Sequence, residues 1–118
     1  MTVLLDFSTL NMNQYEFSRI IGILLDNAIE AASESNEKIL NIEFRYESRS
    51  FRQAIIIENT YSNKNIDLTT IFNKGVTGKE NHTGLGLFKV RQIINKKSNV
   101  YLDTNKTNKF FTQELYIY

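Results

Sequence analysis

The sequence of 118 residues contains no cysteine and no proline, and its single histidine is His82. The lack of cysteine excludes disulfides, thiol catalysis and thiolate metal sites, and one histidine cannot form a histidine cluster. Acidic and basic side chains almost balance, at 13 and 14, which gives a net charge of +1. That balance gives no sign of a polyanion-binding surface, so we expect no nucleic acid partner.

Long hydrophobic runs are also absent from the sequence. No apolar stretch approaches the roughly 18 residues of a membrane span, so we expect that this chain does not itself cross a membrane. Apolar residues make up 42% of the chain and charged residues 23%, as in an ordinary globular protein. A chain of this length buries one core, and we expect residues 1–118 to form a single domain.

Hydrophobic periodicity predicts two helices. Between residues 13 and 34, apolar side chains recur with the i, i+3, i+4, i+7 spacing of one helix face, at Phe17, Ile20, Ile21, Leu24, Leu25, Ala28, Ile29 and Ala32. A second helix is predicted from Gly84 to about Lys97, with Leu87, Val90 and Ile94 on one side. In the polar segment of residues 60–83, only residues 68–72 have the pattern of a short helix.

Alternating and apolar segments predict five strands, and their order determines the expected fold. Residues 2–7 are predicted to form a short first strand. Two hairpins follow: residues 40–46 pair with residues 51–59, and residues 100–103 pair with residues 110–117. The polar turns lie at residues 47–50 and 104–109. The order predicts an α+β fold, a two-layer sandwich with helices packed on one face of a mixed, mostly antiparallel sheet.

The first predicted helix has a polar flank beside its buried face. At 100° per residue, Ile23, Asn27 and Glu30 form one stripe at the edge of the apolar side. Asparagine is a poor helix former, and its amide is costly to bury without a partner. Its oxygen is a suitable ligand for Mg²⁺, although a hydrogen bond to a neighbouring backbone group explains the residue equally simply.

Two glycines open the second predicted helix, within Thr83-Gly84-Leu85-Gly86-Leu87. Glycine permits a close approach of the backbone to another group, or a positive φ. The N-terminus of a helix adds unpaired N–H groups and a partial positive charge, which together suit a phosphate. A tight packing turn is the alternative explanation of this motif.

The segment before those glycines combines an apolar start with a polar, glycine-containing continuation. Ile71 and Phe72 precede Lys74, Gly75 and Lys79. Such a segment is suited to closing over a nucleotide and bringing lysines to its phosphates, and the alternative is a solvated surface loop. We interpret His82, which lies in the same segment, as a loop residue rather than a ligand or a base.

Asn59 ends the more deeply buried of the two central strands. A polar side chain at a strand end can recognise the edge of a base when it faces a pocket. An asparagine at this position can equally begin a turn.

The order and spacing of these motifs resemble the GHKL ATP-binding fold, shared by gyrase, Hsp90, histidine kinases and MutL. Residues 24–30 resemble the N box of that family, Ile71-Phe72 its F box, residues 74–83 its ATP lid and Gly84-Leu85-Gly86-Leu87 its G2 box. The resemblance implies that the chain binds ATP and that Asn27 binds Mg²⁺. The nucleotide-binding residues that it implies are Asn27, Glu30, Asn59, Lys74, Gly75, Lys79, Thr83, Gly84, Leu85, Gly86 and Leu87.

Two departures from the family pattern make the resemblance more specific, and a further difference lies at Glu30. Residues 58–62, Glu-Asn-Thr-Tyr-Ser, replace the usual Asp-x-Gly-x-Gly, which points to Asn59 in adenine recognition. Ile23 stands where hydrolysing relatives carry a general-base glutamate, so no obvious group activates water. Glu30 stands where many typical sensor kinases have lysine.

With these features the chain is similar to the catalytic domains of the peptide-pheromone sensor kinases of Gram-positive bacteria. The resemblance implies transfer of the ATP γ-phosphoryl group to a histidine on an adjacent helical dimerisation domain, which this chain does not contain, and then to a response regulator. It also implies the cytoplasmic part of a membrane-anchored receptor that detects a secreted peptide. The alternative is a regulatory module, of an anti-sigma or non-catalytic type, that binds nucleotide without transferring phosphate.

Overall fold

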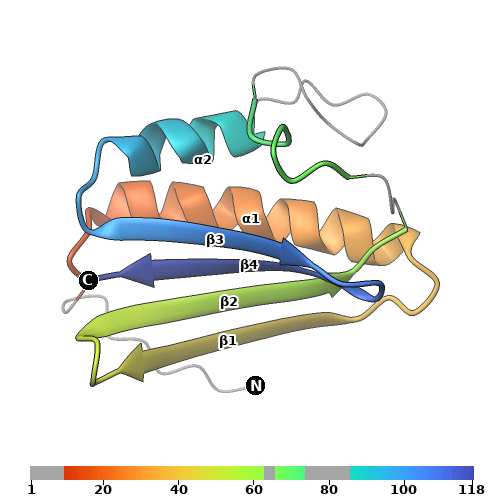
Figure 1. Cartoon of the computed structure of the whole chain (residues 1–118), viewed down its shortest axis with the longest axis horizontal. Helices are drawn as coiled ribbons and strands as arrows, with labels where there is room; N and C mark the ends of the chain where they lie inside the picture. The colour runs from red at the N-terminus through yellow and green to blue at the C-terminus, as the bar shows by residue number, and fades with distance from the viewer. Residues whose placement is uncertain (1–9, 63–65, 74–85) are drawn as a thin grey trace.

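A computed structural model describes residues 10–62, 66–73 and 86–118 of the chain. These residues form two layers, a sheet and a pair of helices that lie on one of its faces (Figure 1). In chain order the elements are α1 (Gln14–Glu34), β1 (Leu40–Glu47), β2 (Arg52–Thr60), α2 (Gly86–Asn95), β3 (Val100–Lys106) and β4 (Phe110–Ile117). The predicted α+β sandwich with both helices on one face is therefore confirmed.

The sheet contains four described strands in the order β1-β2-β4-β3. Every neighbouring pair among them is antiparallel, and in the centre of the sheet Ile55 stands opposite Phe44 on one side and Leu115 on the other. The first strand that the sequence predicts, at residues 2–7, lies outside the described residues. Both predicted hairpins are present, β1 with β2 and β3 with β4.

Helix α1 begins and ends where local hydrogen bonds replace those of the helix backbone. The side chain of Asn13 accepts hydrogen bonds from the backbone N–H groups of Tyr15 and Glu16, at 2.8 and 3.1 Å, which caps the first turn. At the other end the hydroxyl of Ser35 donates to the carbonyl of Ala32 at 2.7 Å. The predicted apolar face is buried at Phe17, Ile20, Leu24, Ala28 and Ala32.

Ile29 belongs to the predicted apolar face but is not buried, since 54% of the residue is exposed. Two side chains that are four residues apart on a helix differ in direction by about 40°, because four residues make slightly more than one full turn. Leu25, four residues earlier, is half-buried at the edge of the core, and this extra rotation brings Ile29 out to solvent.

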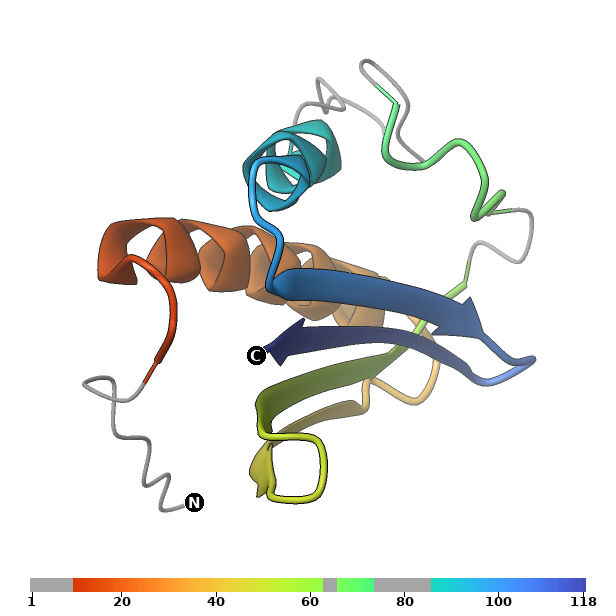
Figure 2. The same cartoon turned by 60° about the vertical axis from the view of Figure 1, so that its left-hand side comes forward.

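The core lies between the two layers. Helix α2 runs beside α1, over the half of the sheet that contains β3, and its Val90 is fully buried (Figure 2). Side chains from both helices and three strands meet there: Phe17, Ile20, Leu24, Ala28, Ile55, Ile57, Val90, Val100, Leu115 and Ile117.

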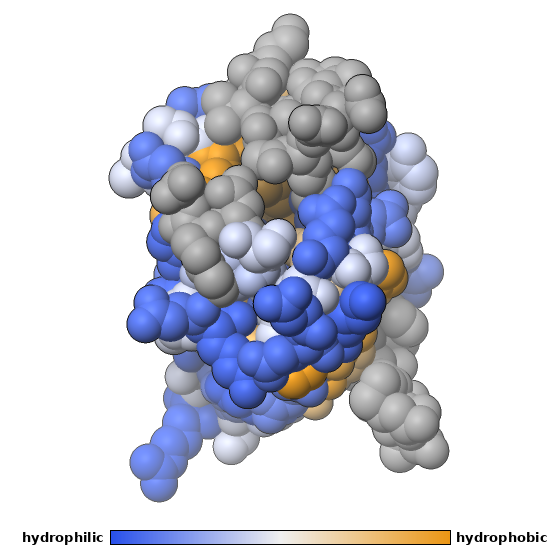
Figure 3. Space-filling model, turned by 90° about the vertical axis from the view of Figure 1, so that its right-hand side faces the viewer, coloured by the Kyte–Doolittle hydropathy of each residue, from blue (hydrophilic) through white to orange (hydrophobic). Residues whose placement is uncertain are grey.

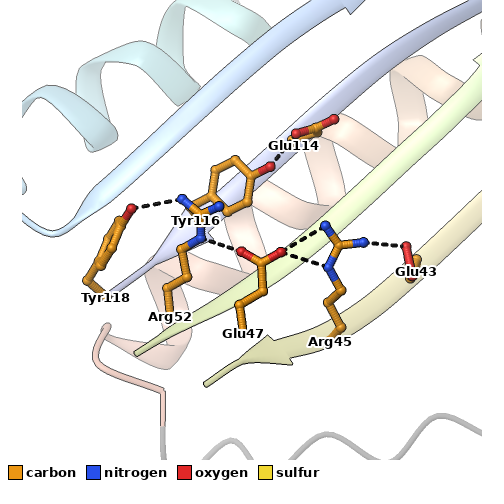
Figure 4. Close-up of polar contacts among 7 residues, drawn as sticks. All are labelled: Glu43, Arg45, Glu47, Arg52, Glu114, Tyr116 and Tyr118. Carbon is orange, nitrogen blue, oxygen red and sulfur yellow. Dashed lines mark hydrogen bonds and ion pairs between the residues drawn. The ribbon is translucent and has the colours of Figure 1, made fainter. Parts of the chain in front are cut away.

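The opposite face of the sheet carries a polar cluster (Figure 4). Arg52 donates to Glu47 and to the hydroxyl of Tyr118, and its guanidinium lies 3.9 Å from the centre of the Tyr116 ring. Hydrogen bonds from Arg52 first, and then from Arg45, lower the pKa of the Glu47 carboxyl below its usual value. This cluster covers β2 where no helix does, which explains why Ala54 is 1% exposed on that face.

Two boundaries differ from those that the sequence predicts. Strand β3 extends to Lys106, because Thr104, Asn105 and Lys106 pair with β4 instead of forming the predicted turn. Residues 68–72 form turns rather than a short helix, with a single helical hydrogen bond from the N–H of Ile71 to the carbonyl of Asp67. Neither described helix has the length and apolar character of a membrane span.

Candidate nucleotide-binding site

The polar flank of α1 lies against the first residue of α2. Ile23, Asn27 and Glu30 are all half-buried, as expected for a stripe at the edge of the core. A methyl group added to Gly86 would lie 3.2 Å from Cγ2 of Ile23. The helix flank predicted to bind the metal and the N-terminus predicted to bind phosphate are therefore neighbours, with Asn27 one turn beyond Ile23 along α1.

The surroundings of Gly86 explain why glycine is needed at the start of α2. Its φ lies outside the left-handed region, so backbone strain is not the reason. The reason is close approach, since a Cβ would be tighter against Ile23 than carbon atoms normally are. The packing explanation of the glycine motif thus holds at Gly86, and this packing brings the unpaired N–H groups of the first turn next to α1.

Several predicted binding residues lie outside the described part of the chain. They are Lys74, Gly75, Lys79, Thr83, Gly84 and Leu85. His82, which we interpret as a loop residue, lies outside the described part as well. Leu87 is described, and its half-buried side chain packs against the core.

Asn59 is buried inside strand β2, where only 2% of the residue is exposed. It pairs with Leu40 and Phe111 and so does not begin a turn. Its side chain points to the helix-covered face, since strand side chains alternate and Ile55 and Ile57 face the core. The amide nitrogen donates to the backbone carbonyl of Thr60 at 2.9 Å, which fixes the orientation of the side chain.

The end of β2 is fastened to the end of α1 by hydroxyl groups. Ser35 and Thr60 share a hydrogen bond of 2.6 Å between their side-chain oxygens. The same oxygen of Thr60 accepts from the backbone N–H of Ile39 at 3.0 Å. This buried network holds Asn59 at a fixed place relative to the polar flank of α1.

Residues 66–73 lie between the end of β2 and α2, and two apolar side chains anchor them. Ile71 and Phe72 are each 9% exposed, so the two apolar side chains that were expected to anchor this segment are buried. Asp67 organises the turn before them, because its carboxylate accepts from the N–H and hydroxyl of Thr69 at 2.9 and 2.6 Å. Those two hydrogen bonds, from the hydroxyl first, lower the pKa of Asp67.

Two basic residues that the sequence analysis did not single out fasten this segment to the rest of the fold. Arg91 on α2 donates to the side-chain oxygen of Asn73 at 3.3 Å, and its guanidinium lies 5.2 Å from the centre of the Phe72 ring. Lys106 at the end of β3 donates to the carbonyl of Ile66 at 2.5 Å. No local pattern reveals such contacts, because they join elements far apart in the sequence.

The described residues do not contain a complete metal site of their own. They include no group of three or more histidine, cysteine, aspartate or glutamate side chains placed to hold a metal ion. Mg²⁺ in nucleotide sites is usually held by one or two protein oxygens together with phosphate and water. A single amide oxygen on a half-buried flank, beside a helix N-terminus, fits that kind of site.

These elements gather at one end of the molecule, where β2 ends and α2 begins (Figure 1). Hydrophilic side chains dominate the surface seen at that end, with hydrophobic surface visible between them (Figure 3). An amide-bearing helix flank, an adjoining helix N-terminus and the anchored segment 66–73 thus lie together in an α+β domain, and this arrangement suits a bound nucleotide.

Comparison with protein-family models gives the family directly. The model of the GHKL domain matches residues 12–118, and the chain therefore belongs to the GHKL domain family. Comparison with curated proteins gives no significant match.

Proposed function

We propose that this chain is the ATP-binding catalytic domain of a histidine kinase. Membership of the GHKL family supports ATP binding. The observation that carries the proposal is the contact between Ile23 and Gly86, which brings the flank with Asn27 next to the N-terminus of α2. A metal ligand and a phosphate-binding helix terminus in that relation form the two halves of a Mg-ATP site.

Each described part of the site has a distinct task. The N-terminus of α2 binds phosphate oxygens through its unpaired N–H groups and its partial positive charge. Asn27 binds the metal through its side-chain oxygen. When bound, Mg²⁺ neutralises phosphate charge and so favours phosphoryl transfer. Asn59, fixed by its bond to Thr60, occupies the strand end where a base edge would be read.

The identity of residue 23 favours transfer to a protein acceptor over hydrolysis. The isoleucine side chain packs on Gly86 and has no group that accepts a proton from water. Phosphoryl transfer needs mainly positioning and charge neutralisation from the protein, and a histidine acceptor supplies its own nucleophile.

The acceptor and the partners follow from the same proposal. The γ-phosphoryl group passes to a histidine on an adjacent helical dimerisation domain, and from there to a response regulator. The two departures at Ile23 and at residues 58–62, together with the sequences of residues 22–31 and 72–79, support assignment to the peptide-pheromone sensor kinases of Gram-positive bacteria. In that case the chain is the cytoplasmic catalytic part of a membrane-anchored quorum-sensing receptor.

A transfer assay with the acceptor restored tests the proposal. The chain is joined to a helical dimerisation domain from a pheromone sensor kinase and incubated with Mg²⁺ and ATP labelled on the γ-phosphate. We expect acid-labile label on the acceptor histidine, lost in the Asn27→Ala variant and in a variant lacking that histidine. Tight ATP binding without any transfer would contradict the kinase proposal and favour the regulatory module.

A further inference from the structure

A shallow groove lies between the first half of α1 and the stretch from Lys89 to Lys96, which covers most of α2 and the residue after its end. Its volume is about 210 Å³, and most of the residues that line it are exposed. The residues that line it are Glu16, Arg19, Lys89, Gln92, Ile93 and Lys96. This groove is distinct from the candidate nucleotide site, because Arg19 precedes Asn27 by two helical turns, about 12 Å along the axis.

The groove concentrates positive charge. Glu16 is already paired with Lys97, at 2.6 Å. Within the described ranges, no carboxylate forms an ion pair with Arg19, Lys89 or Lys96. With Lys97 included, four cations and one carboxylate give this small region a charge of +3, whereas the whole chain has only +1. The rest of the chain is therefore net negative, and the groove is the part of it that attracts an anion.

The solvent face of α1 beside the groove has two further unusual residues. Tyr15 is 71% exposed and lies one turn before Arg19 on the same face. Gly22 lies one turn after Arg19, in the middle of α1, where glycine weakens a helix. A Cβ at Gly22 would meet nothing within 4 Å in the described structure, so packing inside this domain does not require glycine there.

We propose that this face binds an acidic helix of a partner protein. The partner helix presents carboxylates to Arg19, Lys89 and Lys96, and its backbone approaches α1 closely where Gly22 has no side chain. Arginine and tyrosine are, with tryptophan, the residues enriched among those that dominate binding at protein interfaces, and arginine can bind a carboxylate in a bidentate manner. Ile93, a half-buried residue in the lining of the groove, offers an apolar contact, which favours an amphipathic protein segment over a free anion.

A peptide titration tests this proposal without nucleotide. The probe is a synthetic amphipathic peptide of about 15 residues, long enough to be helical, made of glutamate, leucine and alanine. In amide NMR spectra of the isotope-labelled chain, we expect saturable shifts confined to the first half of α1 and to residues 89–97. Affinity should fall as the salt concentration is raised from about 50 to about 500 mM.

Charge-reversal variants locate the binding surface. The double variant Arg19→Glu, Lys96→Glu should bind the peptide at least about tenfold more weakly. The matched control is Arg49→Glu, which reverses an exposed cation in the turn between β1 and β2 and should leave the affinity unchanged. Because no ATP is present, the outcome is independent of whether the nucleotide proposal is correct.

A substitution at Gly22 separates binding from stability. Gly22→Gln adds a good helix former and should raise Tm by about 4 °C. The same variant should weaken peptide binding about tenfold, because the new side chain fills the space for the partner backbone.

Three results would overturn the proposal. The first is the absence of saturable peptide binding, and the second is binding that maps elsewhere or is unchanged in the Arg19→Glu, Lys96→Glu variant. The third is equally variant-sensitive binding to phosphatidylserine vesicles when the peptide does not bind, which would identify a lipid surface as the occupant.

Discussion

Replacing Gly86 by alanine should disturb both folding and nucleotide binding through one contact. The new Cβ would lie 3.2 Å from Cγ2 of Ile23, whereas carbon atoms pack best at about 3.5–4.0 Å. Helix α2 must therefore move away from α1 by a few tenths of an ångström, or Ile23 must change its rotamer. Both responses act on the junction between the polar flank of α1 and the N-terminus of α2.

The size of the effect is set by two opposing contributions. Overpacking typically costs about 1–3 kcal/mol. Alanine is a better helix former than glycine by up to about 1 kcal/mol, which offsets part of that cost. We expect a net loss of about 1 kcal/mol in the free energy of unfolding, or about 4 °C in Tm. The shifted N–H groups should weaken Mg-ATP binding by about tenfold, which corresponds to about 1.4 kcal/mol.

A double-mutant cycle with Ile23→Ala identifies the contact responsible. That substitution removes Cγ2, the atom nearest to the new methyl group. In the double variant the stability loss should be smaller than the sum of the two single losses by at least about 0.5 kcal/mol. Ile23→Val, which keeps two γ-carbons, is the control that should not relieve the contact. Chemical denaturation gives the stabilities and calorimetry gives the affinities.

Two results would refute the reasoning about Gly86. If Gly86→Ala lowers stability but keeps the wild-type affinity, the spacing of the two helices does not govern nucleotide binding. If the double variant regains stability while affinity stays low, the methyl group itself meets the ligand and the spacing argument fails.

Three further predictions concern the segment beside the site, the outer face of the sheet and the reaction. Arg91→Ala should speed amide hydrogen exchange at residues 67–73, because the contacts with Phe72 and Asn73 are lost, and Arg91→Lys should have a smaller effect. Glu47 has a lowered pKa, so its contribution to stability is present above about pH 4.5 and is lost as the pH falls through the lower folded-state value; Glu47→Gln should flatten this dependence in acid denaturation, and an unchanged profile would count against it. The isolated chain should not turn over ATP, because Ile23 cannot activate water, and steady phosphate release from highly purified protein would contradict this.

The elements of this fold are predictable where the pattern is local and long. The buried face of α1 follows from its 3.6-residue period, and the hairpin of β1 with β2 follows from alternation on both sides of a polar turn. The polar run from Thr104 to Lys106 is different, because its pairing with β4 depends on partners elsewhere in the chain. The hydrogen bond of 2.5 Å between the side chains of Thr104 and Gln113 is one such cross-strand contact.

Of the candidate site, the position of the polar helix flank was predictable from the sequence, whereas the contacts between distant elements were not. The periodicity of α1 placed Asn27 and Glu30 at the edge of the core, as the structure has them. Residues 68–72 form turns because one helical turn is too short to offset the cost of helix nucleation. The roles of Arg91 and Lys106 depend on contacts with Phe72, Asn73 and Ile66 across the fold, and a single sequence carries no signal of these pairings.

Calorimetric titration of the chain with ATP, with and without Mg²⁺, tests most directly whether the flank of α1 forms a nucleotide site. We predict Mg²⁺-dependent binding by the wild-type chain. Asn27→Ala should lose it with little change in Tm, because the residue is only half-buried. The control is Asn95→Ala, at the exposed end of α2, which should keep the wild-type affinity. Unchanged Mg-ATP affinity in the Asn27→Ala variant would contradict the assignment of the site.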